Sequence, residues 1–469
     1  SWNQYNHNFN ATLLQETAFN SNSAGAFECW SSHYDRIRRE NEFLRDAAEF
    51  GSKFGEDWLK IRIAEVRFCR AYAYFMLCRV YGGVILRTEV DGPEQNDKAR
   101  STEEECWGFI INELKELAPD LPLKWDSDNS GRATQKAAYG LLSRVALYAE
   151  KWDIAAQAAR DCATAEGNLD LSENGYAKIF ELGINSPEVL FAVEFKSSVI
   201  DHAYDAYVRP SGDTKELGKQ VYSGFVPTSE LVDSYEMAGD GGNFSWEKHG
   251  KDPYANREPR FYATILYNGA DWMGRKIESF VGGKDGYKAY ENAGAAGTTV
   301  TGYYLRKYLI DGDKTWVTSG SGQDWIVLRY AEVLLNKAEA LAMENWNKNS
   351  AEALQALNDV RARVGLPARA TADKETFLEY VRHERKVELA GEGFRYWDLR
   401  RWRLAEKVID GQNVHGVKIS KQSDGSFTYE QVDADGGHKR IFYDRYYRFA
   451  IPLSERSNNS LCTNNDGWI

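Results

Sequence analysis

The stretch IRIAEVRFCRAYAYFMLCRVY, which covers residues 61–81, decides the fold of this chain. Its apolar side chains recur every three or four residues, at Ile61, Ala64, Phe68, Ala71, Phe75 and Cys78. This spacing places them on one face of an α-helix, which buries that face against its neighbours. Gly82 and Gly83 follow at once, and glycine commonly ends helices. The pattern predicts a helix over residues 58–81.

The same kind of pattern returns further along the chain. Residues 139–145 repeat the order Tyr-x-x-Leu-small-Arg-Val of residues 74–80, and a second periodic segment follows at residues 152–163. A looser copy starts at Tyr330 and is followed by residues 350–364. Paired helices with Tyr, Leu and Ala at fixed places are typical of tetratricopeptide (TPR)-like units. The irregular spacing predicts scattered helical hairpins and not a regular solenoid.

The middle of the chain has a different composition. Residues 187–323 hold many of its Gly, Asn, Asp and aromatic residues, with short β-like runs at 189–194 and 262–267. The fold is therefore predicted to be mainly α, with a loop-rich half that contains a few short strands. We predict three segments, namely a helical scaffold at 1–186, an irregular subdomain at 187–325, and a helical region with a terminal irregular segment at 326–469.

Composition and charge exclude several classes of protein. The 469 residues include 58 basic and 70 acidic ones, for a net charge of -12. A general nucleic-acid binder needs a basic surface, so we expect no nucleic-acid partner. No apolar run in the sequence is long enough to span a membrane. The chain begins Ser-Trp-Asn-Gln without Met or a leader, so we expect a mature or shortened form.

Motifs of catalysis and metal binding are missing from the sequence. No HExxH, GxSxG, Walker A or dinucleotide-binding motif occurs, and no CxxC. The acids of residues 384–398 each have an Arg three to seven residues away, a spacing that favours a paired ion network over an acid–base dyad. We therefore predict no catalysis and no cofactor. Calcium stays open at Asp240, Asp311 and Asp313, although acidic residues in turns are usually solvated.

Four sets of segments together resemble one family. They are RFCRAYAYF (67–75) with YGGV (81–84); GRAT (131–134) with AY (138–139) and LSR (142–144); LRYAEVLL (328–335) with AEA (338–340); and ERKVEL (384–389) with EGFR (392–395), DL (398–399) and RW (401–402). In this order they are similar to the SusD/RagB family of Bacteroidetes outer-membrane lipoproteins. The resemblance covers nearly the whole chain.

The resemblance implies both a fold and a function. It implies TPR-like units as a scaffold, and an irregular half that carries the ligand site. It further implies a surface-exposed lipoprotein, anchored in the outer membrane through an N-terminal lipid, with a SusC-like TonB-dependent transporter as partner. Members capture a glycan, or in some cases a peptide, without chemistry. A glycan-active hydrolase is the alternative, and it would need two carboxylates that face one groove.

Aromatic side chains of the irregular half are the candidate ligand-binding residues, because a Trp or Tyr ring matches the C–H face of a sugar. The stretch from Tyr267 to Trp272 places two rings, an amide and a carboxylate within six residues, and Gly269 permits a tight bend there. In contrast, the Trp residues within helical patterns are expected to pack between helices, and these are Trp58, Trp107, Trp152 and Trp402. The candidate site residues are Trp272, Tyr267, Asn268, Asp271, Trp246, Trp316 and Tyr222.

Overall fold

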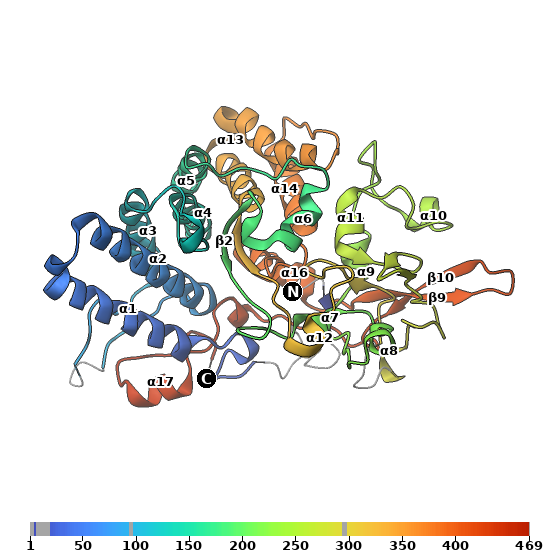
Figure 1. Cartoon of the computed structure of the whole chain (residues 1–469), viewed down its shortest axis with the longest axis horizontal. Coiled ribbons are helices and arrows are strands. Elements are labelled where there is room, and N and C mark those ends of the chain that lie inside the picture. Colours follow the sequence, from blue (N-terminus) through green and yellow to red (C-terminus); the bar gives the residue numbers. More distant parts are fainter. Residues whose placement is uncertain (1–3, 6–18, 93–96, 293–297, 469) are drawn as a thin grey trace. The chain divides into compact units, whose positions relative to one another are not determined.

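The computed structural model describes residues 4–5, 19–92, 97–292 and 298–468, and helices dominate it (Figure 1). The chain divides into two compact units. Unit 1 contains the described residues of Ser1–Gln15, Leu169–Val327 and Leu354–Phe442, and unit 2 those of Glu16–Asn168, Leu328–Ala353 and Tyr443–Ile469. The structure thus divides the chain differently from the three predicted segments, because residues after 326 contribute to both units.

Unit 2 is a series of helices that pack in chain order. Helices α1 to α5 each contact their neighbour in the chain order, and Figure 1 shows them side by side. Short connections join α1 to α2 and α4 to α5, as in helical hairpins, whereas longer segments join α2 to α3 and α3 to α4. The prediction of a mainly α, TPR-like fold is confirmed. The helices of this unit are α1 (Trp30–Phe50), α2 (Glu56–Tyr81), α3 (Glu103–Leu117), α4 (Gln135–Tyr148), α5 (Trp152–Thr164), the first part of α13 (Tyr330–Arg363) and α17 (Leu453–Asn458).

Helix α2 follows the prediction closely. Its buried face includes Ala64, Phe68, Ala71, Phe75 and Cys78, and Gly82 ends the helix with φ 75°. A positive φ suits glycine, because a Cβ would be strained there. Of the six predicted positions, Ile61 is the one that is half-buried and not buried. The apolar period of the sequence therefore gives both the helix and its core face.

Trp58 corrects one of the packing predictions. It lies in the first turn of α2 and is 46% exposed, whereas Trp107 on α3 is buried. The Trp58 ring stacks on the exposed ring of Phe54, with centroids 5.0 Å apart. The first turn of a helix projects beyond its packed neighbours, so the apolar period does not guarantee burial there.

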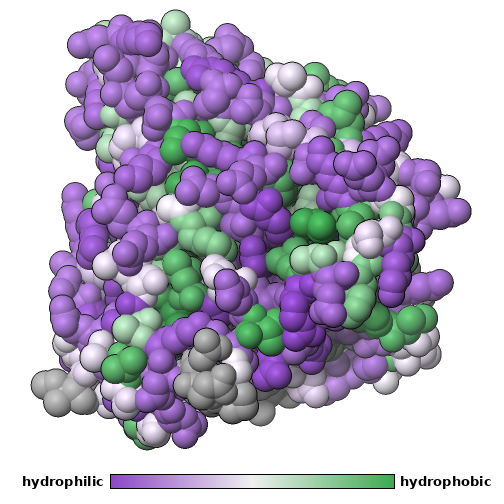
Figure 2. Space-filling model, turned by 90° about the vertical axis from the view of Figure 1, so that its left-hand side faces the viewer, coloured by the Kyte–Doolittle hydropathy of each residue, from purple (hydrophilic) through white to green (hydrophobic). Residues whose placement is uncertain are grey.

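The face of the molecule in Figure 2 is mostly hydrophilic, with hydrophobic residues in separate patches.

The third predicted helix pair is present as α13, in which two helices follow one another across a kink at Asn345. Helix α13 (Tyr330–Arg363) contains Asn345 at φ -164° and ψ 93°, which is outside the helical region. The Asn345 side chain accepts a hydrogen bond from the Lys348 N–H at 3.2 Å. This is the contact of an N-cap residue, so α13 comprises two helices that meet at Asn345.

Unit 1 combines short helices, short strands and long connections. The second part of α13 belongs to it and is followed by α14, whose 15 residues exceed the other helices that lie wholly in this unit. The helices are α6 (Gly175–Leu182), α7 (Tyr204–Val208), α8 (Asp213–Leu217), α9 (Ser229–Val232), α10 (Trp246–His249), α11 (Pro259–Thr264), α12 (Trp316–Ser319), α14 (Lys374–Glu388), α15 (Arg395–Arg401) and α16 (Ala405–Ile409).

The strands form separate two-stranded sheets. The pairs are β1 (Gln4–Tyr5) with β3 (Val226–Pro227), β2 (Val189–Val193) with β8 (Trp325–Arg329), β4 (Ile265–Leu266) with β7 (Tyr304–Leu305), β5 (Asp271–Trp272) with β6 (Arg275–Lys276), and β9 (His415–Lys421) with β10 (Phe427–Asp433). The predicted run at 189–194 is strand β2. The predicted run at 262–267 is wrong in part, because Pro259 starts a helix there and only Ile265 and Leu266 are extended.

The longest strands lie where none was predicted. The hairpin of β9 and β10 is antiparallel, with Phe427 opposite Lys421 and Asp433 opposite His415. It lies outside residues 187–325, where we expected the strands. The side chains of β10 are mostly exposed or half-buried. Phe427 and Tyr429 are half-buried while Thr428 and Glu430 are exposed, so the alternation that marks a half-buried strand is present in this sequence and was overlooked.

A buried ion network joins α11, α13 and α14 within unit 1. Arg260 donates to Glu258 at 2.6 Å and to Glu388 at 2.9 Å, and it also pairs with Glu384. On α13, Arg361 pairs with Glu384 at 3.0 Å and with Glu236 at 2.9 Å, and Arg363 pairs with Glu188 and Glu388. All of these side chains are at most 1% exposed. A buried ion network in this acid-rich segment was predicted and is present, but the local spacing gave the partners correctly for Asp398, which pairs with Arg385 and Arg401, and not for Glu384 and Glu388.

Truncation of Arg260 is expected to destabilise unit 1. The change Arg260→Ala leaves the buried carboxylates of Glu258, Glu384 and Glu388 without a shared partner, which costs about 3–5 kcal/mol. Chemical denaturation followed by circular dichroism measures the loss. Lys276→Ala is the matched control, because Lys276 forms an exposed pair with Asp271 and contributes about 0–1 kcal/mol. Equal unfolding midpoints for the two variants would contradict the role of the network.

Candidate ligand-binding site

The two tryptophans predicted as stacking surfaces, Trp272 and Trp316, lie in the interior of unit 1. Their exposed fractions are 0% and 1%. The Arg209 guanidinium contacts both rings, at 5.3 Å and 5.2 Å from their centroids. The Trp272 indole N–H donates to the buried Asp213 carboxylate at 3.0 Å. Because the ring faces are covered, this structure contradicts a stacking role for both residues.

The other predicted residues fall into several places. Tyr267 is half-buried, with its ring 4.6 Å from that of Tyr254, and Asn268 is buried beside it. Trp246 packs against the same core cluster, and its indole N–H donates to Asp233 at 2.9 Å. Asp271 is exposed and pairs with Lys276 at 2.7 Å.

Tyr222 is the predicted ring with the most open surface. It is 37% exposed and stacks on Tyr207, with centroids 5.1 Å apart and an interplanar angle of 23°. The structure therefore brings Trp246 and Tyr267 to one cluster and Trp272 and Trp316 to Arg209. It does not assemble the predicted set into a single site.

The acids considered for calcium hold turns instead. Asp240 accepts from the Gly242 N–H at 2.8 Å, Asp311 from the Met273 N–H at 2.8 Å, and Asp313 from the Thr315 N–H at 2.9 Å. Within the part of the chain that the structure describes, no group of three or more His, Cys, Asp or Glu side chains is arranged to hold a metal ion. In that same part, no helix is both long enough and apolar enough to cross a membrane.

A pocket of unit 1, here named the Asp205 pocket, offers a better candidate. It encloses about 470 Å³. Its polar lining consists of hydroxyl, amide, ammonium and carboxylate groups, which match the hydroxyl rim of a sugar. Its lining residues are Phe195, Lys196, Ser197, Asp205, Tyr308, Ile310, Asp313, Thr315, Ser321, Gly322 and Gln323.

An aromatic cluster stands next to this pocket. The Tyr308 ring, which lines the pocket, stacks on Trp325 with centroids 5.0 Å apart and an interplanar angle of 14°. Tyr204 contacts both rings, at 5.8 Å and 6.2 Å. Trp325 is 37% exposed. An indole supported on one side and open to solvent on the other is a suitable stacking surface for a sugar ring.

Sequence reasoning missed Trp325. It is the first residue of β8, and the strand WIVLR shows no apolar–polar alternation that would mark its exposed position in advance. Tyr308 was missed as well. It adopts φ 66°, a left-handed conformation that is costly for a residue with a side chain. The Tyr308 side chain both lines the pocket and stacks on Trp325.

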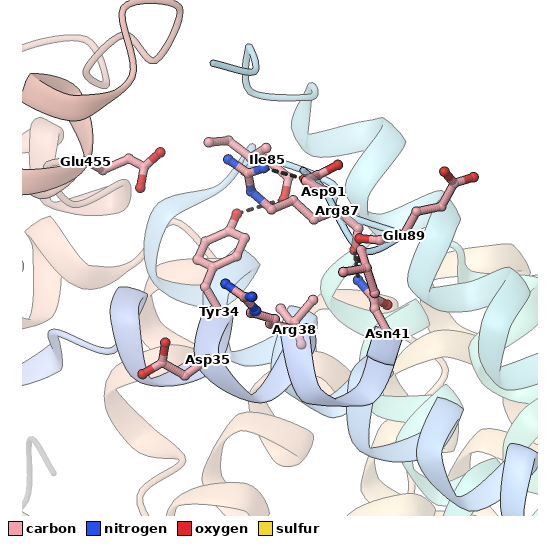
Figure 3. A pocket seen from close by; sticks show the side chains of 11 residues that line it. Tyr34, Asp35, Arg38, Asn41, Ile85, Arg87, Glu89, Asp91 and Glu455 are labelled. Carbon is pink, nitrogen blue, oxygen red and sulfur yellow. Dashed lines mark hydrogen bonds and ion pairs between the residues drawn. The ribbon is translucent and has the colours of Figure 1, made fainter. Parts of the chain in front are cut away.

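Unit 2 also contains a pocket, of about 220 Å³, formed by α1, the segment after α2 and Glu455 (Figure 3). Its polar groups largely satisfy one another. The Tyr34 hydroxyl donates to the Ile85 carbonyl at 2.8 Å, the Asn41 amide to the Arg87 carbonyl at 2.9 Å, and Arg87 pairs with Asp91. These contacts hold the segment after α2 in place, so this pocket is the weaker candidate.

Comparison with known proteins identifies the family. The family model described as "SusD family" matches residues 187–468. The chain belongs to the SusD family. A second SusD-like model, described as "Starch-binding associating with outer membrane", matches residues 1–147. The resemblance predicted from the sequence is confirmed.

Relatives and solved structures agree with this SusD assignment. A SusD-like protein of Bacteroides ovatus is 26% identical over 452 residues, which are 90% of this chain and 74% of the relative. The crystal structure of a SusD-like protein from Bacteroides fragilis has a TM-score of 0.82 at 28% identity and covers 94% of this chain and 85% of that chain. A SusD-like carbohydrate-binding protein of the same species has a TM-score of 0.82 at 24% identity, with 98% and 91% covered.

Trp272→Ala is expected to act on stability. Removing a fully buried Trp leaves a cavity and takes one hydrogen-bond donor from the Asp213 carboxylate, at a cost of about 3–5 kcal/mol. Thermal or chemical denaturation measures this loss. Trp325→Ala is the matched control, since its ring is partly exposed and the loss should be much smaller. A Trp272→Ala variant as stable as the wild type would show that the ring is not a core residue.

Proposed function

We propose that this protein is a non-catalytic, cell-surface glycan-binding protein that delivers captured glycan to a SusC-like TonB-dependent transporter. The observation that carries the proposal is the match to the SusD family, whose models together match residues 1–147 and 187–468. One of these models is described as starch-binding and associated with the outer membrane. The SusD-like carbohydrate-binding protein of Bacteroides fragilis shares the fold.

The Asp205 pocket and Trp325 supply a chemistry that suits a glycan. A sugar presents apolar C–H faces bounded by hydroxyl groups. The open face of Trp325 can stack on such a face, while Asp313, Gln323 and their neighbours can exchange hydrogen bonds with the hydroxyls. The pocket volume is within the range of small-ligand sites.

The same pocket is poorly suited to hydrolysis. Glycoside hydrolysis needs one carboxyl that can give up a proton and a second that attacks or activates water. The Asp205 carboxylate is instead paired with the buried Arg209 at 2.8 Å, and Asp313 accepts hydrogen bonds from Thr315. Both carboxylates already have structural partners. This arrangement supports binding without cleavage.

Binding with and without Trp325 tests the proposal. The protein is incubated with a panel of plant, algal and storage polysaccharides and with peptides, and both retention and cleavage are recorded. We expect retention of a glycan and no products. Trp325→Ala should weaken binding about tenfold or more, because loss of a stacking contact costs about 1–3 kcal/mol. Trp58→Ala, another exposed Trp but in unit 2, should bind as the wild type does.

The outcomes separate the alternatives. Cleavage products that disappear in active-site variants would indicate the hydrolase. Retention of peptides alone would indicate the peptide-binding kind of SusD-like protein. Unchanged glycan affinity in a folded Trp325→Ala variant would remove Trp325 from the site.

Delivery to a transporter predicts a surface location and a stable partner. Protease added to intact cells of the native host should degrade this protein, and gentle detergent extraction should co-purify it with a β-barrel transporter. A cytoplasmic protein of the same cells is the control for lysis. Complete protection from the protease, with lysed cells showing degradation, would contradict the surface location.

A further inference from the structure

We propose that a second pocket of unit 1 recognises an anionic sugar residue, one that bears a carboxylate or a sulfate ester. This inference rests on the proposed glycan-binding function and narrows the class of glycan. The pocket, here named the Arg306 pocket, encloses about 520 Å³. Tyr176, Lys178, Phe180, Tyr262, Arg306 and Leu309 are among its lining residues.

Two cations in this pocket have no carboxylate partner. Lys178 and Arg306 are half-buried, and neither side chain lies within 4.0 Å of a carboxylate oxygen of any residue that the structure describes. The contact that Arg306 does make is from Nη1 to the Tyr262 carbonyl, at 3.5 Å. This distance is long for a hydrogen bond, so most of the guanidinium donors remain available.

Other cations of the same pocket are used differently. Lys307 pairs with Glu392 at 2.8 Å, and Arg363 pairs with Glu188 and Glu388. These residues belong to the packed interior, where each charge meets its counter-charge. Glu181, the one acidic side chain among the lining residues, is exposed. The interior cations are therefore neutralised by carboxylates, whereas Lys178 and Arg306 keep their charge available to a ligand in the pocket.

This excess of positive charge is local. The whole chain carries a net charge of -12, so its average field repels anions. Lys178 and Arg306, two half-buried cations without a carboxylate partner, make the local potential in the pocket positive. A guanidinium offers paired donors that fit a carboxylate or a sulfate, and an ammonium adds a point charge.

The position of the pocket suits a glycan chain. Tyr308 lines both the Arg306 pocket and the Asp205 pocket. The two pockets are therefore neighbours in unit 1, and we infer that one glycan can reach both, with its anionic residue beside Arg306. The Asp205 pocket differs in charge, because Asp205 is neutralised by Arg209 at 2.8 Å and its lining holds both a cation and a carboxylate. The excess of cations is therefore particular to the Arg306 pocket.

Matched saccharides test the inference. The probes are oligogalacturonate, its carboxyl-reduced neutral counterpart, and a sulfated carrageenan oligosaccharide. We expect the wild type to bind an acidic probe about tenfold or more tightly than the neutral one, and the preference to shrink at high salt. The variant Lys178→Gln/Arg306→Gln should lose this preference and keep its affinity for neutral glycan. Lys276→Gln, an exposed cation of unit 1, is the control.

A second measurement does not depend on which glycan is natural. Phenylglyoxal modifies accessible arginines, and mass spectrometry follows the modification of Arg306 in the wild-type protein. D-glucuronate or inorganic sulfate should slow it, whereas D-glucose should not. The difference between the carboxylate and sulfate probes assigns the anion.

The results that overturn the inference are distinct from those that overturn the glycan function. Equal affinity for acidic and neutral glycans, with no protection of Arg306 by either anion, removes the anion preference and leaves glycan binding intact. Protection of Arg306 by anions, without retention of any saccharide, keeps an anion site and removes the glycan function. An unchanged preference in the folded double variant also overturns the inference.

Discussion

The buried ion network of unit 1 fixes how its distant segments meet. Arg260 on α11 and Arg361 and Arg363 on α13 share two carboxylates of α14, Glu384 and Glu388. Such a network adds little to stability when compared with an apolar core, but an arrangement that leaves one charge unpaired costs several kcal/mol. The network therefore selects one way of joining these helices.

The position of the candidate site depends on the position of α11, because strand β4, strand β7 and the loop after it link α11 to the pocket residues. Strand β4 continues directly from α11, the helix of Arg260, and it pairs with β7. Arg306 follows β7, and its backbone N–H donates to the Thr264 carbonyl at the end of α11, at 2.7 Å. Tyr308 comes two residues later. A shift of α11 would move the side chains that separate the two pockets, so the network positions the loops that carry the site.

The sequence predicts the helices better than the site, for a physical reason. An apolar period is a local property, as residues 61–81 show. The acids of 384–398 indicated buried charge pairs, but the partners of Glu384 and Glu388 come from α11 and α13, which no local spacing reveals. The role of a single Trp is not local. Trp272 and Trp325 each lie in a short strand and directly follow an aspartate in the sequence, so their local sequences are alike. Trp272 meets Asp213 and Arg209 in the interior, whereas Trp325 rests on Tyr308 with a partly open face. Only the tertiary structure separates them.

The cost of burying an unpaired charge explains the other ion pairs of unit 1 and distinguishes them from the cations of the Arg306 pocket. Arg209 meets Asp205 and Asp213, and Arg275 meets Asp213 and Asp285, because a buried charge without a partner is strongly unfavourable. Where the chain supplies the counter-charge, the cation is structural and has no capacity left for a ligand. Where it supplies none, as in the Arg306 pocket, water or a ligand must do so. Specificity for a ligand can therefore reside in a small number of cations outside the network, while the many paired charges keep the pocket in shape.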